Sequence, residues 1–225
     1  MAAGAAPPPD DGEHRRLKIL DRAARALLTH GYDGANLEDI AIAAGVSKVT
    51  IYRFFSSKND LLRAVVRQAA AGMIAGCRGA LRSDLAPENA LTGFAERYIA
   101  GMLAPVAAGR PFYEISRLLI SMSLRDPELA RSFTEMYQPD ITLPLTDYLA
   151  AAAERGEIDT DDPDFLAKHF IQALFFTNAA LLAPGDGFSS EQIRDLASRK
   201  VGLFLRGCAR RSPPVFPPMS PHGAA

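Results

Sequence analysis

The chain has 225 residues, of which 48% are hydrophobic and 23% charged, an ordinary globular composition that allows one large or two small domains. No apolar stretch reaches the roughly 18 residues that a membrane helix needs, so we expect a cytoplasmic protein without membrane contact. The two cysteines, Cys77 and Cys208, lie far apart in the sequence, and their spacing indicates neither a disulfide framework nor a zinc site.

Charge is unevenly distributed along the chain, although its formal sum is only -1. Residues 13–82 carry 12 Lys/Arg against 6 Asp/Glu, a balance of +6, whereas residues 83–225 carry 13 against 18, a balance of -5. Residues 1–12 add -2. This distribution is typical of a basic DNA-contacting domain attached to an acidic body that does not touch phosphates.

The first segment, residues 1–12, is rich in Ala and Pro and offers nothing to bury, so we expect a disordered tail. A first helix is predicted from about Glu13 to Thr29, with a leucine-rich face and many arginines elsewhere. Gly31 is expected to end it.

Residues 36–58 predict two short helices that meet at a tight corner. Asn36 can cap the first helix, and its apolar residues recur at helical spacing until Gly45. A glycine just past a helix end supplies the left-handed conformation that the turn needs, and Ser47 can then cap the second helix.

On the second helix, Ile51 and Phe55 are expected to point together into the core, at about 100° per residue. Val49 and Arg53 then lie on the opposite face, with Thr50 and Tyr52 on the flanks. Two helices joined by a short turn with Gly, the second carrying a polar and cationic outer face, are the arrangement that places a recognition helix in the DNA major groove.

At these residues the sequence resembles the TetR (tetracycline-repressor) family of bacterial one-component regulators. The motifs that carry the resemblance are Gly31-Tyr32-Asp33, Asp39-Ile40-Ala41, Ala44-Gly45-Val46-Ser47-Lys48, Thr50-Ile51-Tyr52 and Phe55-x-x-Lys58. The resemblance is specific over roughly residues 13–70. The resemblance implies an all-α homodimer that binds palindromic double-stranded DNA and responds to a small-molecule effector, and we expect a repressor.

Position matches to the family assign the DNA contacts. Thr50, Tyr52 and Lys58 are expected to touch the DNA backbone, and Asn36 a phosphate through its helix N-terminus. Base edges would be reached by Lys48, Val49, Thr50 and Arg53, with arginine able to take guanine by two hydrogen bonds. This chain has Val49 where many members carry a smaller residue, which changes the base contact open to it.

The rest of the chain is predicted to be helical with short breaks. A fourth helix would continue as a connector to about residue 82, where Gly72, Gly76 and Gly79 indicate either close helix packing or a flexible joint. Further helices are expected over residues 87–104, 111–125, 127–155, 163–183 and 189–210, with a kink or a break near Pro139 and Pro144. The domains are then residues 13–73 for DNA binding and 83–211 for ligand binding and dimerisation, with a disordered tail over 212–225.

The stretch from Phe165 to Leu182 is apolar almost all round, so a helix there must be covered on both sides. The resemblance implies that the last two helices of each subunit form a four-helix dimer interface. A central helix of a monomeric bundle is the alternative.

An effector pocket is expected from aromatic, flexible and isolated polar residues on the helices that surround the ligand in the resembled family. These residues are Phe94, Tyr98, Met102, Phe112, Tyr113, Arg117, Phe133, Tyr137, His169, Gln172 and Phe176. For each aromatic residue, simple core packing is the competing interpretation. Arg117 and His169 are singled out because a cation flanked by apolar neighbours needs a partner or an acidic ligand. We therefore expect a mostly apolar effector, with a carboxylate or a phenol group.

No catalytic site, metal site or cofactor is predicted. The four histidines show no metal spacing, and the sequence holds neither a nucleophile elbow nor a phosphate loop. Two alternatives remain open: a helical binding protein or enzyme that keeps the helix-turn-helix only as scaffold, and a family member without a small-molecule effector.

Overall fold

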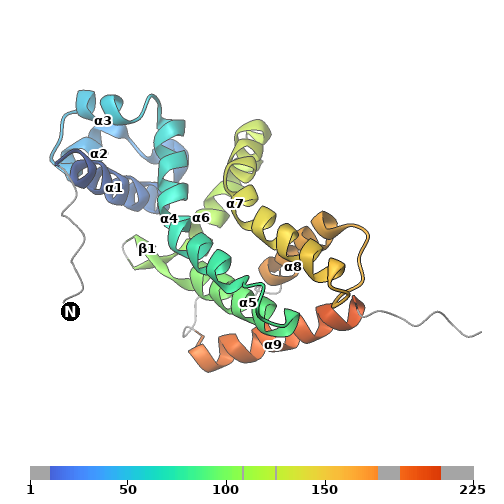
Figure 1. Ribbon diagram of the computed structural model, residues 1–225. Helices are drawn as coiled ribbons and strands as arrows, with labels where there is room; N and C mark the ends of the chain where they lie inside the picture. Colours follow the sequence, from blue (N-terminus) through green and yellow to red (C-terminus); the bar gives the residue numbers. More distant parts are fainter. Residues whose placement is uncertain (1–10, 108, 125, 177–187, 209–225) are drawn as a thin grey trace, which may run out of the picture.

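The computed structural model describes residues 11–107, 109–124, 126–176 and 188–208, without the side chains of residues 129–130, 132–138 and 176. The chain forms two helical parts joined by one long helix (Figure 1). In the first part, α1 (Asp11–Gly34), α2 (Leu37–Ala44) and α3 (Lys48–Phe54) gather at one end of the molecule, and α4 (Lys58–Ala80) leads away from them. The predicted all-α fold is confirmed.

The first three helices pack around a small apolar core that their spacing predicts. Ile19, Leu20 and Leu27 of α1 are buried, as are Ile40 of α2 and Ile51 of α3. Helix α1 begins at Asp11, two residues earlier than expected, and its helical geometry is interrupted at Gly31 (φ 72°, ψ 178°). The glycine therefore breaks the helix where the sequence predicted an end, and one further turn follows it.

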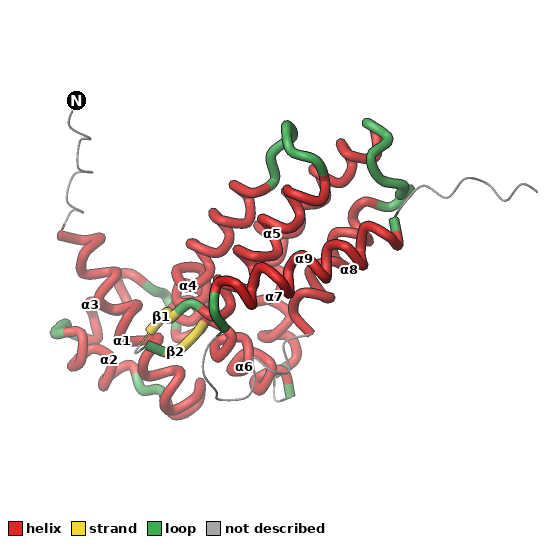
Figure 2. The backbone as a smooth tube through the Cα atoms, turned by 90° about the horizontal axis from the view of Figure 1, so that it is seen from below, coloured by secondary structure: helices red, strands yellow, loops and turns green. Residues whose placement is uncertain are grey.

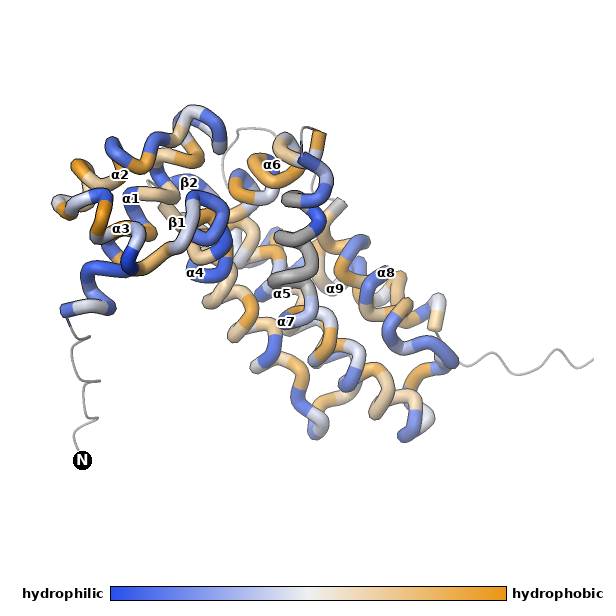
Figure 3. Tube along the Cα trace, turned by 90° about the horizontal axis from the view of Figure 1, so that it is seen from above, coloured by the Kyte–Doolittle hydropathy of each residue, from blue (hydrophilic) through white to orange (hydrophobic). Residues whose placement is uncertain are grey.

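The second part consists of α5 (Pro87–Leu103), α6 (Phe112–Ser123), α7 (Pro127–Glu154), α8 (Pro163–Phe176) and α9 (Ser190–Gly207). Figure 3 shows hydrophobic and hydrophilic stretches alternating along each tube, as amphipathic helices require. Helix α4 packs against α5, and α5 in turn packs against α9. In the described part of the chain, no helix is long and apolar enough to cross a membrane.

Helix α7 runs without a break through Pro139 and Pro144. A break near residues 138–143 is thus excluded, while Figure 1 shows the helix changing direction along its length. Each proline removes one backbone donor and crowds the preceding turn, which bends a helix without ending it when tertiary packing holds both halves.

A two-stranded hairpin, β1 (Pro105–Ala107) and β2 (Arg110–Pro111), was not predicted (Figure 2). Its strands are too short and too rich in proline to show alternation in the sequence. The hairpin packs on α1, and the guanidinium of Arg110 donates to the Leu28 carbonyl of α1 while pairing with Glu114 of α6. The hairpin therefore connects the second part of the chain directly to the first, in addition to the connection through α4.

The glycine at which two helices pack closely is Gly101 of α5, and not one of the glycines of the connecting helix α4. A Cβ atom at Gly72 or Gly79 would meet nothing within 4 Å, and one at Gly76 would make ordinary contacts with Arg97. At Gly101 of α5, by contrast, a Cβ atom would lie 2.6 Å from Met73 Cβ and 2.5 Å from Met73 Cγ. The close-packing interpretation of the α4 glycines was wrong for Gly72 and Gly79, because both lie on open faces of the helix.

This difference predicts opposite effects for two identical substitutions. Gly101→Ala should lower the free energy of unfolding by about 1–3 kcal/mol, because the new methyl group overpacks the contact with Met73. Gly72→Ala should raise it by about 0.5–1 kcal/mol, because alanine loses less backbone entropy in an exposed helical position. Urea unfolding of both variants checks this, and equal effects of the same sign would contradict the assignment of the close contact.

Candidate DNA-binding site

The corner between α2 and α3 is fixed by local hydrogen bonds that the sequence predicted. Gly45 adopts the left-handed conformation (φ 69°), and its N–H donates to the carbonyls of Ala41 and Ile42. The Ser47 hydroxyl accepts the Thr50 N–H at 3.1 Å and lies 2.9 Å from the Thr50 hydroxyl. These bonds set the direction in which α3 leaves the turn.

Two apolar side chains anchor α3, and the others on it face outward or to the flanks. Ile51 is 1% exposed and Phe55, which caps the helix, 2%. Val49, in contrast, is 71% exposed and Tyr52 49%. Arg53 and Lys48 are also exposed, whereas Thr50 is half-buried, with its hydroxyl 2.9 Å from that of Ser47.

Lys48 begins α3, and its ammonium lies 3.3 Å from Glu38 Oε2 of α2. Both side chains are largely exposed, so this ion pair contributes little stability. The pairing could not be foreseen from the sequence, because it joins residues on two different helices.

Asn36 and Lys58 flank the motif at the starts of α2 and α4. The side chain of Asn36 accepts the Glu38 N–H at 3.0 Å, which caps α2 as predicted. The Lys58 ammonium lies 3.4 Å from the Asp33 carbonyl oxygen and 4.6 Å from the centroid of the Tyr32 ring. Partial burial lowers the pKa of Lys58, and the nearby Asp33 carboxylate opposes that shift.

A hydrogen bond beside Lys58 was not predicted from the sequence. The Tyr32 hydroxyl donates to the Asn59 side-chain oxygen, which links the end of α1 to the first turn of α4. The ring of Tyr32 thereby becomes the fixed surface on which Lys58 rests. Lysine is thus held near the start of α4 by an aromatic face and a carbonyl group.

Some of the residues expected to form an effector pocket are buried in the structure, and others are exposed. Phe94, Tyr98 and Met102 of α5 and Phe112 of α6 are buried, and Tyr113 is half-buried. The Phe94 ring lies 6.4 Å from Tyr98 and 6.1 Å from Phe170 of α8, between ring centroids. The side chains of Phe133, Tyr137 and Phe176 lie outside the described residues.

Three polar candidates do not point into this apolar region. Arg117 is exposed because Ile115 and Leu119, on either side of it, turn the opposite face of α6 to the core. His169 and Gln172 are exposed on the outer face of α8, and the His169 ring stacks on Phe165 at 6.2 Å. Arg117 and His169, which were expected to need a partner because apolar residues flank them, are therefore open to solvent.

No cluster of three or more His, Cys, Asp or Glu side chains in the described residues could hold a metal ion. Cys77 is buried against the Phe94 carbonyl, and burial raises the pKa of its thiol to about 12, which keeps it protonated and unreactive at neutral pH.

Comparisons with known proteins agree with this geometry in both parts of the chain. Residues 19–65 match the bacterial regulatory proteins of the tetR family, and residues 89–209 match the C-terminal domain of AefR-like transcriptional repressors. The transcriptional repressor AcnR of Corynebacterium efficiens is 29% identical over 196 residues, which cover 85% of this chain and 95% of AcnR.

Solved structures show the same architecture. A TetR-family transcriptional regulator from Mesorhizobium loti MAFF303099 has a TM-score of 0.73 and 26% identity, over 90% of this chain and 100% of that one. AibR, in complex with isovaleryl coenzyme A and operator DNA, has a TM-score of 0.59 and 21% identity, over 85% of this chain and 98% of its own. From its two matched domains and the exposed face of its helix-turn-helix, the chain belongs to the TetR family of bacterial DNA-binding transcriptional regulators.

Proposed function

We propose that the protein is a homodimeric repressor that binds a palindromic operator and is released by a small, largely apolar effector. Residues 13–73 would form the DNA-binding unit, and residues 83–211 the sensing and dimerising unit. The observation that carries the proposal is the outward face of α3, where Val49, Tyr52 and Arg53 are exposed while Ile51 holds the helix in place. A short helix with most of its side chains directed outward suits insertion into a major groove.

Dimerisation is supported by apolar surface on the last two helices. Phe165 of α8 is 66% exposed and Leu203 of α9 is 69% exposed. His169 and Gln172 follow Phe165 at helical spacing and continue its exposed face. In a dimer, this surface would be covered by its copy, and the two α3 helices could reach half-sites about 34 Å apart, one turn of DNA.

For the effector, we propose a site among the aromatic and flexible side chains of α5 and α6. Phe94, Tyr98, Met102 and Phe112 are buried apolar side chains of these two helices, and the Phe94 ring lies 6.1 Å from that of Phe170 on α8. AibR, which shares the fold, binds isovaleryl coenzyme A, and this supports a first search among short acyl thioesters and hydrophobic acids. Binding there would act on DNA affinity only through a difference in affinity for two arrangements of α4 and the hairpin.

Selection of bound sequences from random duplex DNA, at a stated salt concentration, tests the DNA-binding proposal, and a palindrome should be enriched. With that duplex, Arg53→Ala should cost about 1–3 kcal/mol and relax the preference at one base pair per half-site, because alanine cannot bind the base edge. Tyr52→Phe should weaken binding about equally on all sequences, because phenylalanine has no hydroxyl to bind the DNA backbone.

Failure of the wild-type protein to enrich any sequence, with dimerisation established separately, would favour a helix-turn-helix kept only as scaffold. Enrichment of a single half-site without its inverted copy would contradict the proposed symmetry. Both results are read from the same selection.

The proposed dimer predicts that Phe165→Glu and Leu203→Glu each shift the protein to a monomer in analytical ultracentrifugation, because a charge buried at a symmetric interface has no partner. Ile120→Glu is the matched control, since Ile120 is 56% exposed but lies on α6. A dimer that survives both substitutions, or that dissociates equally in the control, would show that another surface holds the subunits together.

The exposure of Arg117 predicts that it plays no part in effector binding. Arg117→Ala should leave the effector concentration for half-release of the operator duplex unchanged, measured by fluorescence anisotropy with an effector found in the search. A rise of about tenfold, equal to about 1.4 kcal/mol, would instead show that Arg117 binds the ligand.

A further inference from the structure

A cleft of about 370 Å³ lies where the two parts of the protein meet, between α1, α4 and strand β1 of the hairpin. Figure 1 shows this region, with the hairpin beside α1 and α4. None of the residues that line the cleft is expected to contact DNA or to belong to the effector site proposed above. Seven of them are apolar and two are polar: Leu17, Leu20, Asp21 and Ala24 of α1, Val65, Gln68 and Ala69 of α4, and Pro105 and Val106 of β1.

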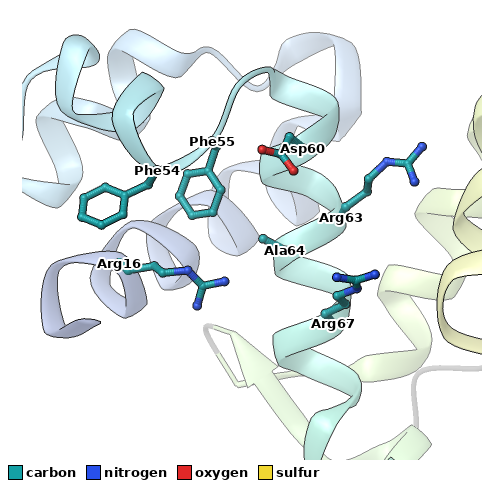
Figure 4. Close-up of a pocket in the computed structure, with 7 residues that line it drawn as sticks. All are labelled: Arg16, Phe54, Phe55, Asp60, Arg63, Ala64 and Arg67. Atoms are coloured by element: carbon teal, nitrogen blue, oxygen red, sulfur yellow. The ribbon is translucent and has the colours of Figure 1, made fainter. Parts of the chain in front are cut away.

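A neighbouring cleft of about 340 Å³, between α1, the end of α3 and α4, has a different chemistry (Figure 4). Its lining is mainly charged and aromatic: Arg16, Phe54, Phe55, Asp60, Arg63, Ala64 and Arg67. An apolar molecule placed there would remove water from charged groups without replacing their hydrogen bonds. An uncharged apolar ligand therefore distinguishes the cleft beside the hairpin from this one.

The apolar surface of the cleft beside the hairpin comes from three elements. On α1 and α4 its lining residues recur every three or four positions, so each helix turns one continuous face toward the cleft. Leu20, Ala24 and Val65 are buried, and Ala69 and Val106 are half-buried. A molecule in the cleft would therefore contact the DNA-binding part and the hairpin at the same time.

The hairpin is attached to α1 just beyond the cleft. Leu28 follows Ala24 by one turn on the same face of α1, and its carbonyl accepts a hydrogen bond from the Arg110 guanidinium of β2. Pro105, at the cleft, is exposed. A ligand in the cleft would thus add a second connection between the hairpin and α1, one turn away from the first.

The polar side chain on α1 indicates which ligand the cleft can take. The Asp21 carboxylate accepts a hydrogen bond from Arg25 Nε at 3.1 Å, and Arg22 Nη1 lies 3.7 Å from it. Its charge is thus compensated, so the cleft does not require a cation, and the carboxylate itself disfavours an anion. A carboxylate can accept about four hydrogen bonds, which leaves room for a donor from a ligand.

The size and place of the cleft are also those of a small-molecule site. Such sites measure about 300–1,000 Å³, are lined mainly by apolar groups with a few polar ones, and are frequent at domain interfaces. A volume of about 370 Å³ lies at the lower end of that range and suits a molecule of one or two rings.

We propose that this cleft is a second ligand site, which binds an uncharged, mainly apolar small molecule that donates one hydrogen bond to Asp21. The ligand would hold α1, α4 and β1 together, and so would stabilise the arrangement in which the hairpin lies on both helices. DNA affinity changes through this site only as far as DNA binding itself favours or disfavours that arrangement.

The first test is titration calorimetry of the full-length protein with indole, and with benzofuran as an isosteric probe that lacks the N–H donor. Indole should bind in the millimolar range or more tightly, and roughly threefold to tenfold more tightly than benzofuran, because only indole donates to Asp21. In Asp21→Ala the two probes should bind equally, because alanine offers no acceptor. The lost ion pair with Arg25 is largely exposed, so this variant should remain folded.

A second variant, Ala69→Leu, tests the location of the site, because the longer side chain fills the cleft. It should weaken indole binding by at least about tenfold. Ala71→Leu is the matched control, since it makes the same substitution at an exposed position of the same helix, and it should bind indole like the wild type. If Ala69→Leu lowers the melting temperature, the ratio of the two probes in Asp21→Ala decides instead.

Absence of indole binding would overturn the assignment, as would binding that Ala69→Leu and Asp21→Ala both leave unchanged. Binding that appears only after residues 1–10 are removed would assign the cleft to that segment of the chain and not to a small molecule.

The effect on DNA rests on the proposed DNA binding and is measured separately, by fluorescence anisotropy with the enriched operator duplex. Indole should change the affinity for the duplex, the duplex should change the affinity for indole by the same factor, and both changes should disappear in Ala69→Leu. Equal operator affinity with and without bound indole would overturn the regulatory role. The calorimetric test needs no DNA, so failure of the repressor function and failure of the ligand site are distinguishable.

Discussion

The structure depends on holding a seven-residue helix in place while leaving its outer face free. An isolated helix of this length is unstable in water, because too few hydrogen bonds offset the cost of nucleation. Helix α3 is stabilised from its ends and its back: Gly45 turns the chain, Ser47 caps the first turn, and Ile51 and Phe55 bury two side chains. Phe54 is half-buried against the core. The exposed side chains of α3, Lys48, Val49, Tyr52 and Arg53, can be chosen for contact with DNA instead of for folding.

Helices α1 and α4 are therefore part of the DNA-binding unit, although neither is expected to contact a base. Phe55 is buried in the core, and the centroid of its ring lies 5.8 Å from the guanidinium carbon of Arg16 on α1. Tyr32 plays a similar part on the other side, where its hydroxyl binds Asn59 and its ring supports Lys58. The buried ring of Phe55 and the half-buried ring of Tyr32 thus lie against Arg16 and Lys58.

The two parts of the chain are connected by α4 and by the hairpin. Helix α4 runs from the DNA-binding core to the contact between Met73 and Gly101, where it packs closely on α5. The hairpin meets the far end of α1 through the Arg110 guanidinium and the Leu28 carbonyl. A shift of α5 or α6 can thus reach the recognition helix by two routes, one through α4 and one through α1.

Features set by neighbours in the sequence could be predicted from it. The helical class, the corner at Gly45, the caps Asn36 and Ser47, and the outward direction of Val49 and Arg53 all follow from spacing and local hydrogen bonding within a few residues. The charge division between the two parts of the chain was also visible without coordinates. Position matches to a known family then named the candidate DNA contacts.

Features that depend on which helices meet were decided by the tertiary structure alone. The exposure of Arg117 and His169 depends on which face of a helix is covered. The close contact of Gly101 with Met73 and the hydrogen bond from Arg110 of the hairpin to Leu28 join residues far apart in the chain. Periodicity shows that a helix has an apolar face, but it does not show which neighbour covers that face or where the covering ends. For this protein, the sequence determined the helices and the helix-turn-helix motif. The packing of the helices determined which side chains remain exposed and able to bind.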